Sequence, residues 1–352
     1  MEYVDVAVIG GGQSGLAAAR ALRQHGIRPV VLEASEQAAG SWPRYYDSLT
    51  LFSPARYSSL PGLPFGDDPG RYPHRDEVVD YLLRYADRLD AEIRTGHRVH
   101  EVRRDGDGFR VTLTDGSQLG TRAVVAATGG FGRPNQPALE GLESFTGTVL
   151  HVAQYRDPKP FAGQRVVVVG AGNSAVQVAA ELAGHARVSL ASRAPVRWFK
   201  QRPLGSKDLH FWLQVTGLDI APLGRFQRAP ATMAVIDDGR YRAALAAGTP
   251  DRRPMFAAVE GSKVIWPDGP AEEVDAIVLA TGYRPDLGYL GPLGALDAPG
   301  RPRHRDGIAH AHPGLAYVGL EWQRSLSSAS LRGVGRDAGR IARHLAAHLA
   351  RP

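Results

Sequence analysis

The sequence of 352 residues contains no cysteine. A chain without thiols forms no disulfide, offers no thiolate to a metal ion and carries no redox dithiol. Any redox chemistry must therefore belong to a bound cofactor. The sequence also lacks an apolar run near the ~20 residues that span a bilayer, and its N-terminus shows no basic stretch followed by a cleavable apolar one. We therefore expect no membrane span and a cytoplasmic protein.

A concentrated block of positive charge is also missing. Lys and Arg number 42 and Asp and Glu 36, for a formal net charge of +6. The arginines are spread along the chain, which argues against nucleic-acid binding. A basic protein that binds polyanionic cofactors explains the charge more simply. Because His310 and His312 have no acidic or cysteine partners at metal-ligand spacing, we expect no metal site.

Glycine, by contrast, is abundant, and its spacing is most informative in residues 4–33. An apolar strand pattern meets Gly10, Gly12 and Gly15 at G-x-G-x-x-G spacing, and an alanine-rich helical pattern follows. The first glycine permits a tight turn, the second lets the backbone approach a pyrophosphate, and the third lets helix and strand pack closely. The helix N-terminus presents free N–H groups to the phosphates. The stretch therefore predicts a dinucleotide-binding βαβ unit.

The same pattern returns 160 residues later, in residues 165–182. Gly170 and Gly172 repeat the first two glycines, and Ala175 takes the third position, where alanine is allowed. At the same offset Glu33 corresponds to Arg193. The repeat predicts a second nucleotide site of different specificity.

The acid and the arginine distinguish the two predicted sites. Glu33 suits free ribose hydroxyls and repels a 2′-phosphate. Arg193 would form charge-assisted hydrogen bonds to a 2′-phosphate, each worth about 1.5–3 kcal/mol. That energy corresponds to a roughly ten- to hundredfold preference for NADPH over NADH. We therefore expect FAD in the first site and NADPH in the second, with NADH accepted more weakly.

Further predicted ligands flank each motif. For FAD they lie at the first helix start, in the loop after it, in a small β-meander, in the first Ala-Thr-Gly run and before the last helix: Gln13, Ser14, Gly40, Ser41, Trp42, Val99, Thr128, Gly129 and Gln323. For NADPH they lie at the second helix start, beside the arginine and in the second Ala-Thr-Gly run: Asn173, Ser174, Ser192, Thr281 and Gly282.

The order of motifs predicts an α/β fold with two Rossmann-like, three-layer βαβ domains, the NADPH domain being inserted into the FAD domain. We expect the FAD-binding domain to comprise residues 1–156 and 283–352, and the NADPH-binding domain residues 157–282. The Pro-rich residues 157–160 are typical of an interdomain linker. The sequence pattern predicts an irregular insertion over residues 196–254 and a terminal helix over residues of about 327–349.

Two dinucleotide motifs that each end in an Ala-Thr-Gly run resemble the flavoproteins with two dinucleotide-binding domains. Within that group, Phe145, Gly147, His151 and Tyr155 match the F-x-G-x-x-x-H-x-x-x-[YFW] fingerprint of class B flavin monooxygenases. Residues 280–283 are similar to the same family's late ATGY motif. The resemblance covers nearly the whole chain and is closest to small bacterial members, including those encoded beside arsenic-resistance genes.

The resemblance implies an FAD-containing monooxygenase in which NADPH delivers a hydride to flavin N5. The reduced flavin would react with dioxygen to form a C4a-hydroperoxide. That species oxygenates a small soft nucleophile, a thioether or an amine, or a ketone by Baeyer–Villiger oxidation. The expected partners are a small-molecule substrate and dioxygen, and a homodimer is the usual family expectation. The protein contributes placement, electrostatics and exclusion of water.

Two candidate catalytic residues come from the same resemblance. Many family members carry an asparagine after an S-[VL]-x-T stretch, and Phe52 stands at that position here. Phenylalanine shields a flavin from water but cannot hydrogen-bond a peroxide. His151, in the fingerprint, is the second candidate. Its alternative role is to hold the interdomain linker by hydrogen bonds.

Other functions stay open at this point. The departure at Phe52 favours a second hypothesis, an NADPH oxidase or flavin reductase with poorly coupled oxygenation. A third hypothesis, a non-catalytic redox or NADPH sensor, rests on the basic charge and on the apolar patch at residues 209–213. A dithiol reductase is excluded, because no cysteine exists to relay electrons.

Overall fold

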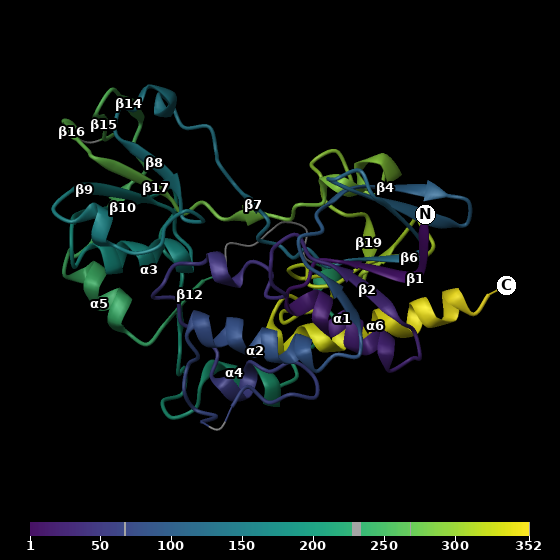
Figure 1. Ribbon diagram of the computed structural model, residues 1–352. Helices are drawn as coiled ribbons and strands as arrows, with labels where there is room; N and C mark the ends of the chain where they lie inside the picture. The colour runs from purple at the N-terminus through teal and green to yellow at the C-terminus, as the bar shows by residue number, and fades with distance from the viewer. Residues whose placement is uncertain (67, 227–233, 268, 352) are drawn as a thin grey trace.

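A computed structural model describes residues 1–66, 68–226, 234–267 and 269–351 of the chain. The chain forms two units side by side, and both termini lie on the same one (Figure 1). This arrangement follows from the chain order, because the second unit is formed by residues between two halves of the first. The predicted α/β class with two nucleotide-binding folds is confirmed.

The first unit is built on a nine-stranded sheet. Its parallel centre runs in the order β3-β2-β1-β6-β21, with the bounds Glu92–Arg94, Pro29–Leu32, Glu2–Ile9, Gln118–Ala126 and Leu315–Tyr317. Antiparallel strands extend it: β4 (Val99–Asp105), β5 (Gly108–Leu113), β19 (His304–Arg305) and β20 (Ile308–Ala309). The fully buried residues of β1 and β6 explain why both strands read as continuous apolar runs.

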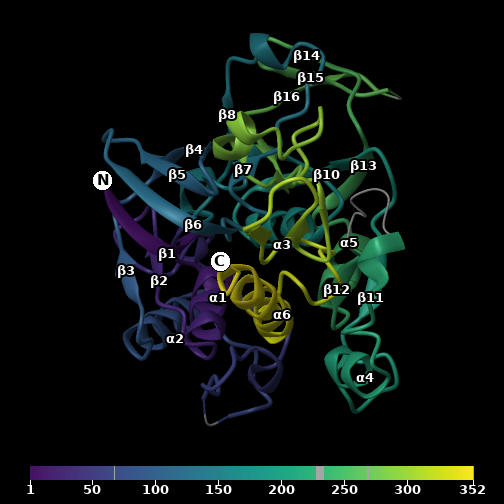
Figure 2. The same cartoon turned by 90° about the vertical axis from the view of Figure 1, so that its right-hand side faces the viewer.

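Three helices cover one face of this sheet, and the β4–β5 hairpin covers the other (Figure 2). The helices are α1 (Gln13–Arg23), α2 (Arg75–Asp87) and α6 (Leu331–Leu349). The last helix begins four residues later than expected, because Ser327–Ser330 form a hydrogen-bonded turn in which the Ser330 hydroxyl donates to the Ser327 carbonyl at 2.7 Å. The short 3-10 helix η6 (Gly288–Leu293) packs with the hairpin.

The second unit holds a five-stranded, all-parallel sheet in the order β13-β10-β9-β17-β8. The strand bounds are Asp251–Pro254, Arg187–Ser192, Arg165–Val169, Ala276–Leu279 and Thr148–His151. Helices α3 (Asn173–Leu182) and α5 (Arg240–Ala246) pack on one face. The antiparallel strands β14 (Ala258–Glu260), β15 (Lys263–Ile265) and β16 (Ala271–Glu273) cover the other. Three layers again result.

The chain crosses between the units earlier than the expected boundary at residues 156 and 157. Strand β8 pairs with β17, so residues 148–151 belong to the second sheet. The crossing itself is a two-stranded ribbon of β7 (Arg133–Pro134) and β18 (Tyr283–Arg284). The Pro-rich residues form the 3-10 helix η4 (Lys159–Phe161) within the second unit, since Phe161 is buried in its core.

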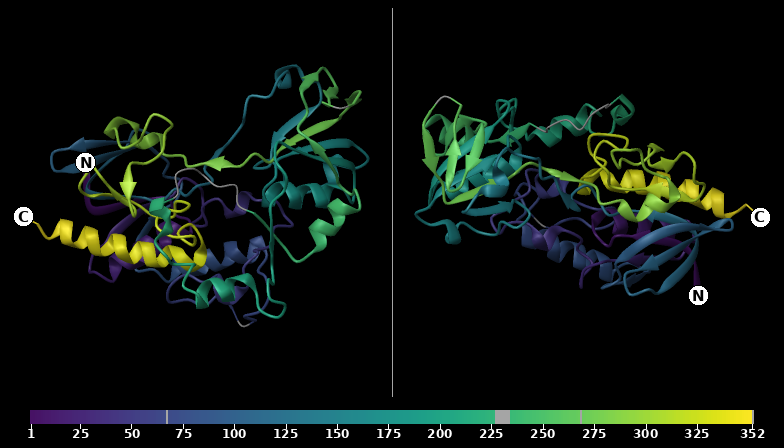
Figure 3. Two further views of the ribbon diagram at one scale, coloured as in Figure 1. Left: turned by 180° about the vertical axis from the view of Figure 1, so that it is seen from behind. Right: turned by 90° about the horizontal axis from the view of Figure 1, so that it is seen from above.

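Part of the expected insertion leaves the second unit. Residues 198–226, called the arm here, contain β11 (Trp198–Lys200), α4 (Leu209–Val215) and the 3-10 helix η5 (Leu223–Phe226). The arm packs against the first unit (Figures 1 and 3). Residues 227–233 of the insertion lie outside the described residues. The chain then returns through β12 (Val235–Asp237), which pairs with β11. Among the described helices, none is both long and apolar enough to cross a membrane.

Candidate functional site

The first cradle is the turn between β1 and α1. Gly10 has φ +107°, and a Cβ there would lie 2.7 Å from the Ala127 carbonyl oxygen. A Cβ on Gly15 would overlap the Gly10 carbonyl oxygen, and one on Gly12 would lie 3.3 Å from Cα of Gly40. Close backbone approaches therefore require glycine at positions 10 and 15 and leave little room for a side chain at position 12. The cradle has the shape that a pyrophosphate needs.

Glu33 closes this cradle at the end of β2. Its side chain is buried, with 6% exposed. One carboxylate oxygen accepts a hydrogen bond from the Gly11 amide at 2.6 Å, and the other accepts from the Ser35 amide at 2.8 Å and hydroxyl at 2.7 Å. These bonds fix the carboxylate beside the glycine turn. The oxygen that accepts from Gly11 keeps a lone pair that can accept from a ribose hydroxyl.

Side chains around the start of α1 bind one another. The Gln13 amide donates to the Ala329 carbonyl at 2.6 Å and accepts from the Trp42 indole at 3.0 Å. The Ser41 hydroxyl lies 2.9 Å from the Tyr45 hydroxyl, and Ser14 is buried. No side chain caps the helix start among the described residues. The first N–H groups of α1 are therefore free to face phosphate.

The other predicted FAD ligands fall in different places. Thr128 donates to the Asp286 carbonyl at 3.2 Å, beside Gly129 with φ +75°. Val99 begins β4 close to Glu33, because the His97 amide donates to the Glu33 carbonyl at 2.8 Å. Gln323 lies after β21, and its contact with FAD stays a prediction. Its buried amide donates to the Tyr317 carbonyl at 2.8 Å and holds the turn after β21.

The second cradle, between β9 and α3, is more open. Gly170 has φ +149°, and its position, like that of Gly10, faces the backbone of an Ala-Thr-Gly run. A Cβ on Gly172 would meet nothing within 4 Å among the described residues. Asn173 accepts a hydrogen bond from the Ile236 amide at 3.1 Å, while Ser174 is half-buried on the first turn of α3. This cradle also fits a pyrophosphate.

Ser192 and Arg193 stand at the end of β10, where Glu33 stands in the first unit. The Ser192 hydroxyl is buried and donates to the Ala194 carbonyl at 2.8 Å. Arg193 is exposed, and it forms no hydrogen bond or ion pair with any residue that the structure describes. A guanidinium so placed is available to an anionic ligand.

His151 supports the second Ala-Thr-Gly run. Its Nε2 lies 3.0 Å from the Gly282 carbonyl oxygen, and its Nδ1 accepts from the Ala153 amide at 3.1 Å. Thr281 and Asn135 exchange side-chain and backbone hydrogen bonds at 2.5 and 3.0 Å. Burial lowers the pKa of His151, which keeps the ring neutral and able to donate from Nε2. Nε2 thus holds the turn, while the bond from Ala153 to Nδ1 fixes the ring against its own segment.

Aromatic side chains join the two cradles, which the glycine motifs alone did not predict. Ring centroids are 5.4 Å apart for Trp42 and Tyr45, 6.4 Å for Tyr45 and Phe131, and 5.4 Å for Phe131 and Tyr283. Tyr283 in turn contacts His151 at 5.0 Å. Phe131 and Tyr283 each follow an Ala-Thr-Gly run closely. This repeated placement was the sequence signal that could have predicted the aromatic contact between the cradles.

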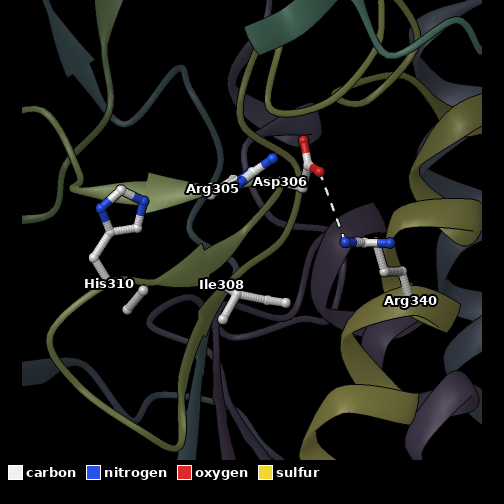
Figure 4. Close-up of a pocket in the computed structure, with 6 residues that line it drawn as sticks. Arg305, Asp306, Ile308, His310 and Arg340 are labelled. Atoms are coloured by element: carbon white, nitrogen blue, oxygen red, sulfur yellow. Dashed lines mark ion pairs between the residues drawn. The ribbon is translucent and has the colours of Figure 1, made fainter.

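Two hollows on the surface involve none of the predicted ligands. One, of about 710 Å³, is lined by Arg305, Asp306, Ile308, Ala309, His310 and Arg340, with Arg340 of α6 3.7 Å from Asp306 (Figure 4). The other, of about 400 Å³, lies between Tyr46 and the helices α3 and α5. Across the described chain, His, Asp and Glu side chains nowhere gather in threes as metal ligands.

A chain with two such cradles, each at the end of parallel strands, is an oxidoreductase of the kind that holds two dinucleotides. The family model for pyridine nucleotide-disulphide oxidoreductases matches residues 7–213, more than half of the chain. The chain therefore belongs to the pyridine nucleotide-disulphide oxidoreductase family. The disulfide part of that name does not apply to its chemistry, because the chain has no cysteine.

Relatives point to flavin monooxygenases within the family. An uncharacterized CzcO-like oxidoreductase of Geobacillus kaustophilus is 32% identical over 348 residues, covering 95% of this chain and 96% of that protein. The indole-3-pyruvate monooxygenase YUCCA1 of Oryza sativa is 32% identical over 316 residues, covering 80% and 77%. The solved flavin-containing monooxygenase of Stenotrophomonas maltophilia superposes with a TM-score of 0.87 at 34% identity, covering 99% and 100%. The expected resemblance to class B flavin monooxygenases is confirmed, and with it an enzyme that uses FAD and NADPH.

Proposed function

We propose that this enzyme binds FAD in the first cradle and NADPH in the second, and that it oxygenates small soft nucleophiles. Glu33 would bind the ribose of FAD, while Gly10, Gly12 and the first N–H groups of α1 hold its pyrophosphate. Gly170, Gly172 and the start of α3 would hold the pyrophosphate of NADPH, with Arg193 on its 2′-phosphate. The difference between a fixed, buried acid and an exposed guanidinium supports this division.

The two cofactors supply hydride transfer and the activation of dioxygen when bound. The chain's own residues place them. Trp42, Tyr45, Phe131 and Tyr283 form an apolar wall between the cradles, which limits the access of water. The backbone ribbon of β7 and β18 sets where the second cradle stands relative to the first.

The observation that carries the oxygenation proposal is the bond between the His151 ring and the Gly282 carbonyl at 3.0 Å. It connects the fingerprint of class B flavin monooxygenases to the Ala-Thr-Gly turn of the NADPH cradle. The lack of cysteine removes the disulfide chemistry that shares this fold. The indole-3-pyruvate monooxygenase relative and the Stenotrophomonas maltophilia enzyme, at 32% and 34% identity, are both monooxygenases, whereas bacillithiol disulfide reductases share only the fold, at 20% and 22% identity.

The substrate class we propose is a thioether or an amine, with a ketone as the third kind to test. The rings of Tyr45, Phe131 and Tyr283 present mainly apolar surface, which favours molecules of low polarity. The test is oxygen balance. Enzyme, NADPH and ¹⁸O₂ are mixed with a sulfide, an amine or a ketone, and labelled product is compared with hydrogen peroxide. Labelled product is expected; NADPH use matched entirely by peroxide with all three classes would contradict the proposal.

One observation favours a second candidate, an NADPH oxidase or flavin reductase. Phe52 presents a phenyl ring and a backbone carbonyl, and the carbonyl already accepts a hydrogen bond from Gln201 at 2.9 Å. The side chain of this residue therefore offers no hydrogen-bond donor to an oxygenated flavin. If the second candidate is right, Phe52→Asn increases the product-to-peroxide ratio several-fold. An unchanged ratio, with product formed by both enzymes, would exclude it.

A further inference from the structure

The arm carries a buried polar cluster that neither cradle uses. Asp208, whose side chain is 9% exposed, caps α4 and accepts from the His210 amide at 2.8 Å and lies 2.7 Å from the His210 ring nitrogen. Its second oxygen accepts from the Tyr72 hydroxyl at 2.7 Å and from the Gln201 amide at 2.5 Å. Four polar groups thus meet on one carboxylate. The cluster joins the arm to the first unit through Tyr72.

The charge state of the cluster supports this geometry. Burial opposes the ionisation of Asp208, but hydrogen bonds from His210, Tyr72 and Gln201 outweigh it and hold the pKa of the carboxyl below its usual value. Burial and the bond to Asp208 raise the pKa of Tyr72 to about 12, so this tyrosine remains a donor. A charged acceptor makes stronger hydrogen bonds than a neutral one. Asp208 therefore fixes the amide of Gln201.

Gln201 lies between the two units. Its side chain, 8% exposed, also donates to the Phe52 carbonyl of the first unit at 2.9 Å. Its backbone amide donates to the Asp237 carbonyl of β12 at 2.8 Å. The neighbouring Ile236 amide donates to Asn173, the first residue of α3, at 3.1 Å. A continuous line of hydrogen bonds therefore runs from the second cradle, through Gln201, to the Phe52 segment.

We propose that Gln201, held by Asp208, is a positioning residue that fixes the second cradle against the Phe52 segment at the separation that hydride transfer needs. This inference rests on the proposed placement of FAD and NADPH. Hydride transfer depends steeply on distance, and a misplacement of about 1 Å costs up to about a hundredfold in rate. A short side chain bonded on both sides, and buried, holds such a distance better than exposed ion pairs do.

Three variants separate positioning from folding. Gln201→Leu keeps the size of the side chain but removes both of its donated hydrogen bonds. Asp208→Asn keeps the oxygen that caps α4 and replaces the oxygen that accepts from Gln201 and Tyr72. Tyr72→Phe is the matched control, because it removes one bond to Asp208 and leaves both bonds of Gln201 in place. Bound FAD and melting temperature are measured for each.

The experiment is anaerobic stopped-flow reduction of the flavin by NADPH, with no oxygen and no substrate present. We expect Gln201→Leu and Asp208→Asn to lower the limiting rate at saturating NADPH at least about tenfold. The NADPH dissociation constant should stay within about twofold, and Tyr72→Phe should stay within about twofold in both values. A rise in that constant with an unchanged limiting rate would overturn the proposal, as would wild-type rates in both variants.

A second readout needs no cofactor. In the cofactor-free protein, hydrogen exchange of amides in residues 49–55 should be about fivefold faster in Gln201→Leu than in the wild type. Unchanged exchange, or loss of FAD from the purified variant, would contradict positioning and give the residue a different role. Failure of the wild type to oxygenate any substrate would contradict the proposed function. It would not affect this inference, because neither the anaerobic reduction rate nor the hydrogen exchange involves oxygen.

Discussion

The two cradles share one backbone plan and differ in their walls. In the first, the backbone of Gly40 lies against the glycine turn, and the acid at the end of β2 is buried and accepts three hydrogen bonds. In the second, the space beside Gly172 is open, and the arginine at the end of β10 is exposed. A closed cradle suits a cofactor that stays bound, and an open one suits a cofactor that enters and leaves at each turnover. The same fold thus serves two ways of binding.

The largest effect is expected from adding one methyl group to the closed cradle. In Gly15→Ala the Cβ would overlap the Gly10 carbonyl oxygen, so α1 must move away from β1. We expect a loss of about 3 kcal/mol in the free energy of unfolding, and loss of bound FAD. Gly172→Ala adds the same methyl group to the open cradle, at the counterpart of Gly12, and this control variant should keep the fold and its FAD. Urea unfolding measures the stability of each variant, and the flavin absorbance measures its bound FAD. Equal losses in both variants would contradict the difference between a closed and an open cradle.

A smaller effect is expected at the buried acid. Glu33→Gln places an amide NH₂ where either the Gly11 amide or the Ser35 groups donate, and weakens the acceptor for the ribose. With about 1.5–3 kcal/mol per charged hydrogen bond, FAD affinity should fall about a hundredfold. Equilibrium titration of the cofactor-free protein with FAD measures this loss. NADP⁺ affinity should stay within about twofold; an equal loss for both would show that the acid supports the fold rather than one cofactor.

In the open cradle, Arg193 occupies the position that corresponds to Glu33. Because it binds no described residue, Arg193→Ala should leave the melting temperature unchanged. KM for NADPH should rise about ten- to hundredfold and KM for NADH hardly change. Arg193→Glu copies the acid of the first cradle and should make NADH the preferred donor. Steady-state kinetics with both donors test this, and parallel changes in the two KM values would place the arginine away from the 2′-phosphate.

The smallest effect concerns the pH dependence of stability at His151. Burial lowers the pKa of this ring in the folded state, so the unfolded chain binds more protons once the pH falls below about 6.5. This residue therefore stabilises the fold at neutral pH and loses that contribution as the pH drops toward the folded pKa. His151→Gln keeps a donor for Gly282 without titrating. Between pH 7.5 and 5 the wild type should lose at most about 4 °C more than the variant. A steeper loss in the variant would contradict this origin.

Much of this arrangement could be predicted from the sequence, because local patterns determine it. The offset of 160 residues places α1 at Gln13 and α3 at Asn173, each directly after a glycine. Glycine spacing and apolar strands act within one βαβ unit, so no long-range information is needed. The same reasoning located Glu33 and Arg193.

The contacts between units could not be predicted in this way. Strand β8 joins the second sheet by pairing with β17, more than a hundred residues away, and no local signal marks that pairing. In the arm, the only sequence signal was the apolar patch at residues 209–213. Its packing depends instead on hydrogen bonds from Tyr72 to Asp208 and from Gln201 to Asp208 and Phe52. Such polar clusters depend on which segments the fold brings together. Gln323 stays a predicted FAD ligand, and the hydrogen bond from its side chain to the Tyr317 carbonyl could not be predicted from local sequence either.

The central claim is that one chain holds two different adenine cofactors at once, each in its own cradle. Calorimetric titration of the cofactor-free protein with FAD, followed by NADP⁺ and, separately, NAD⁺, tests it most directly. We predict one FAD per chain, then one NADP⁺ per chain without release of flavin, with NAD⁺ binding about ten- to hundredfold more weakly. Displacement of FAD by NADP⁺, or a total of one nucleotide per chain, would contradict the account.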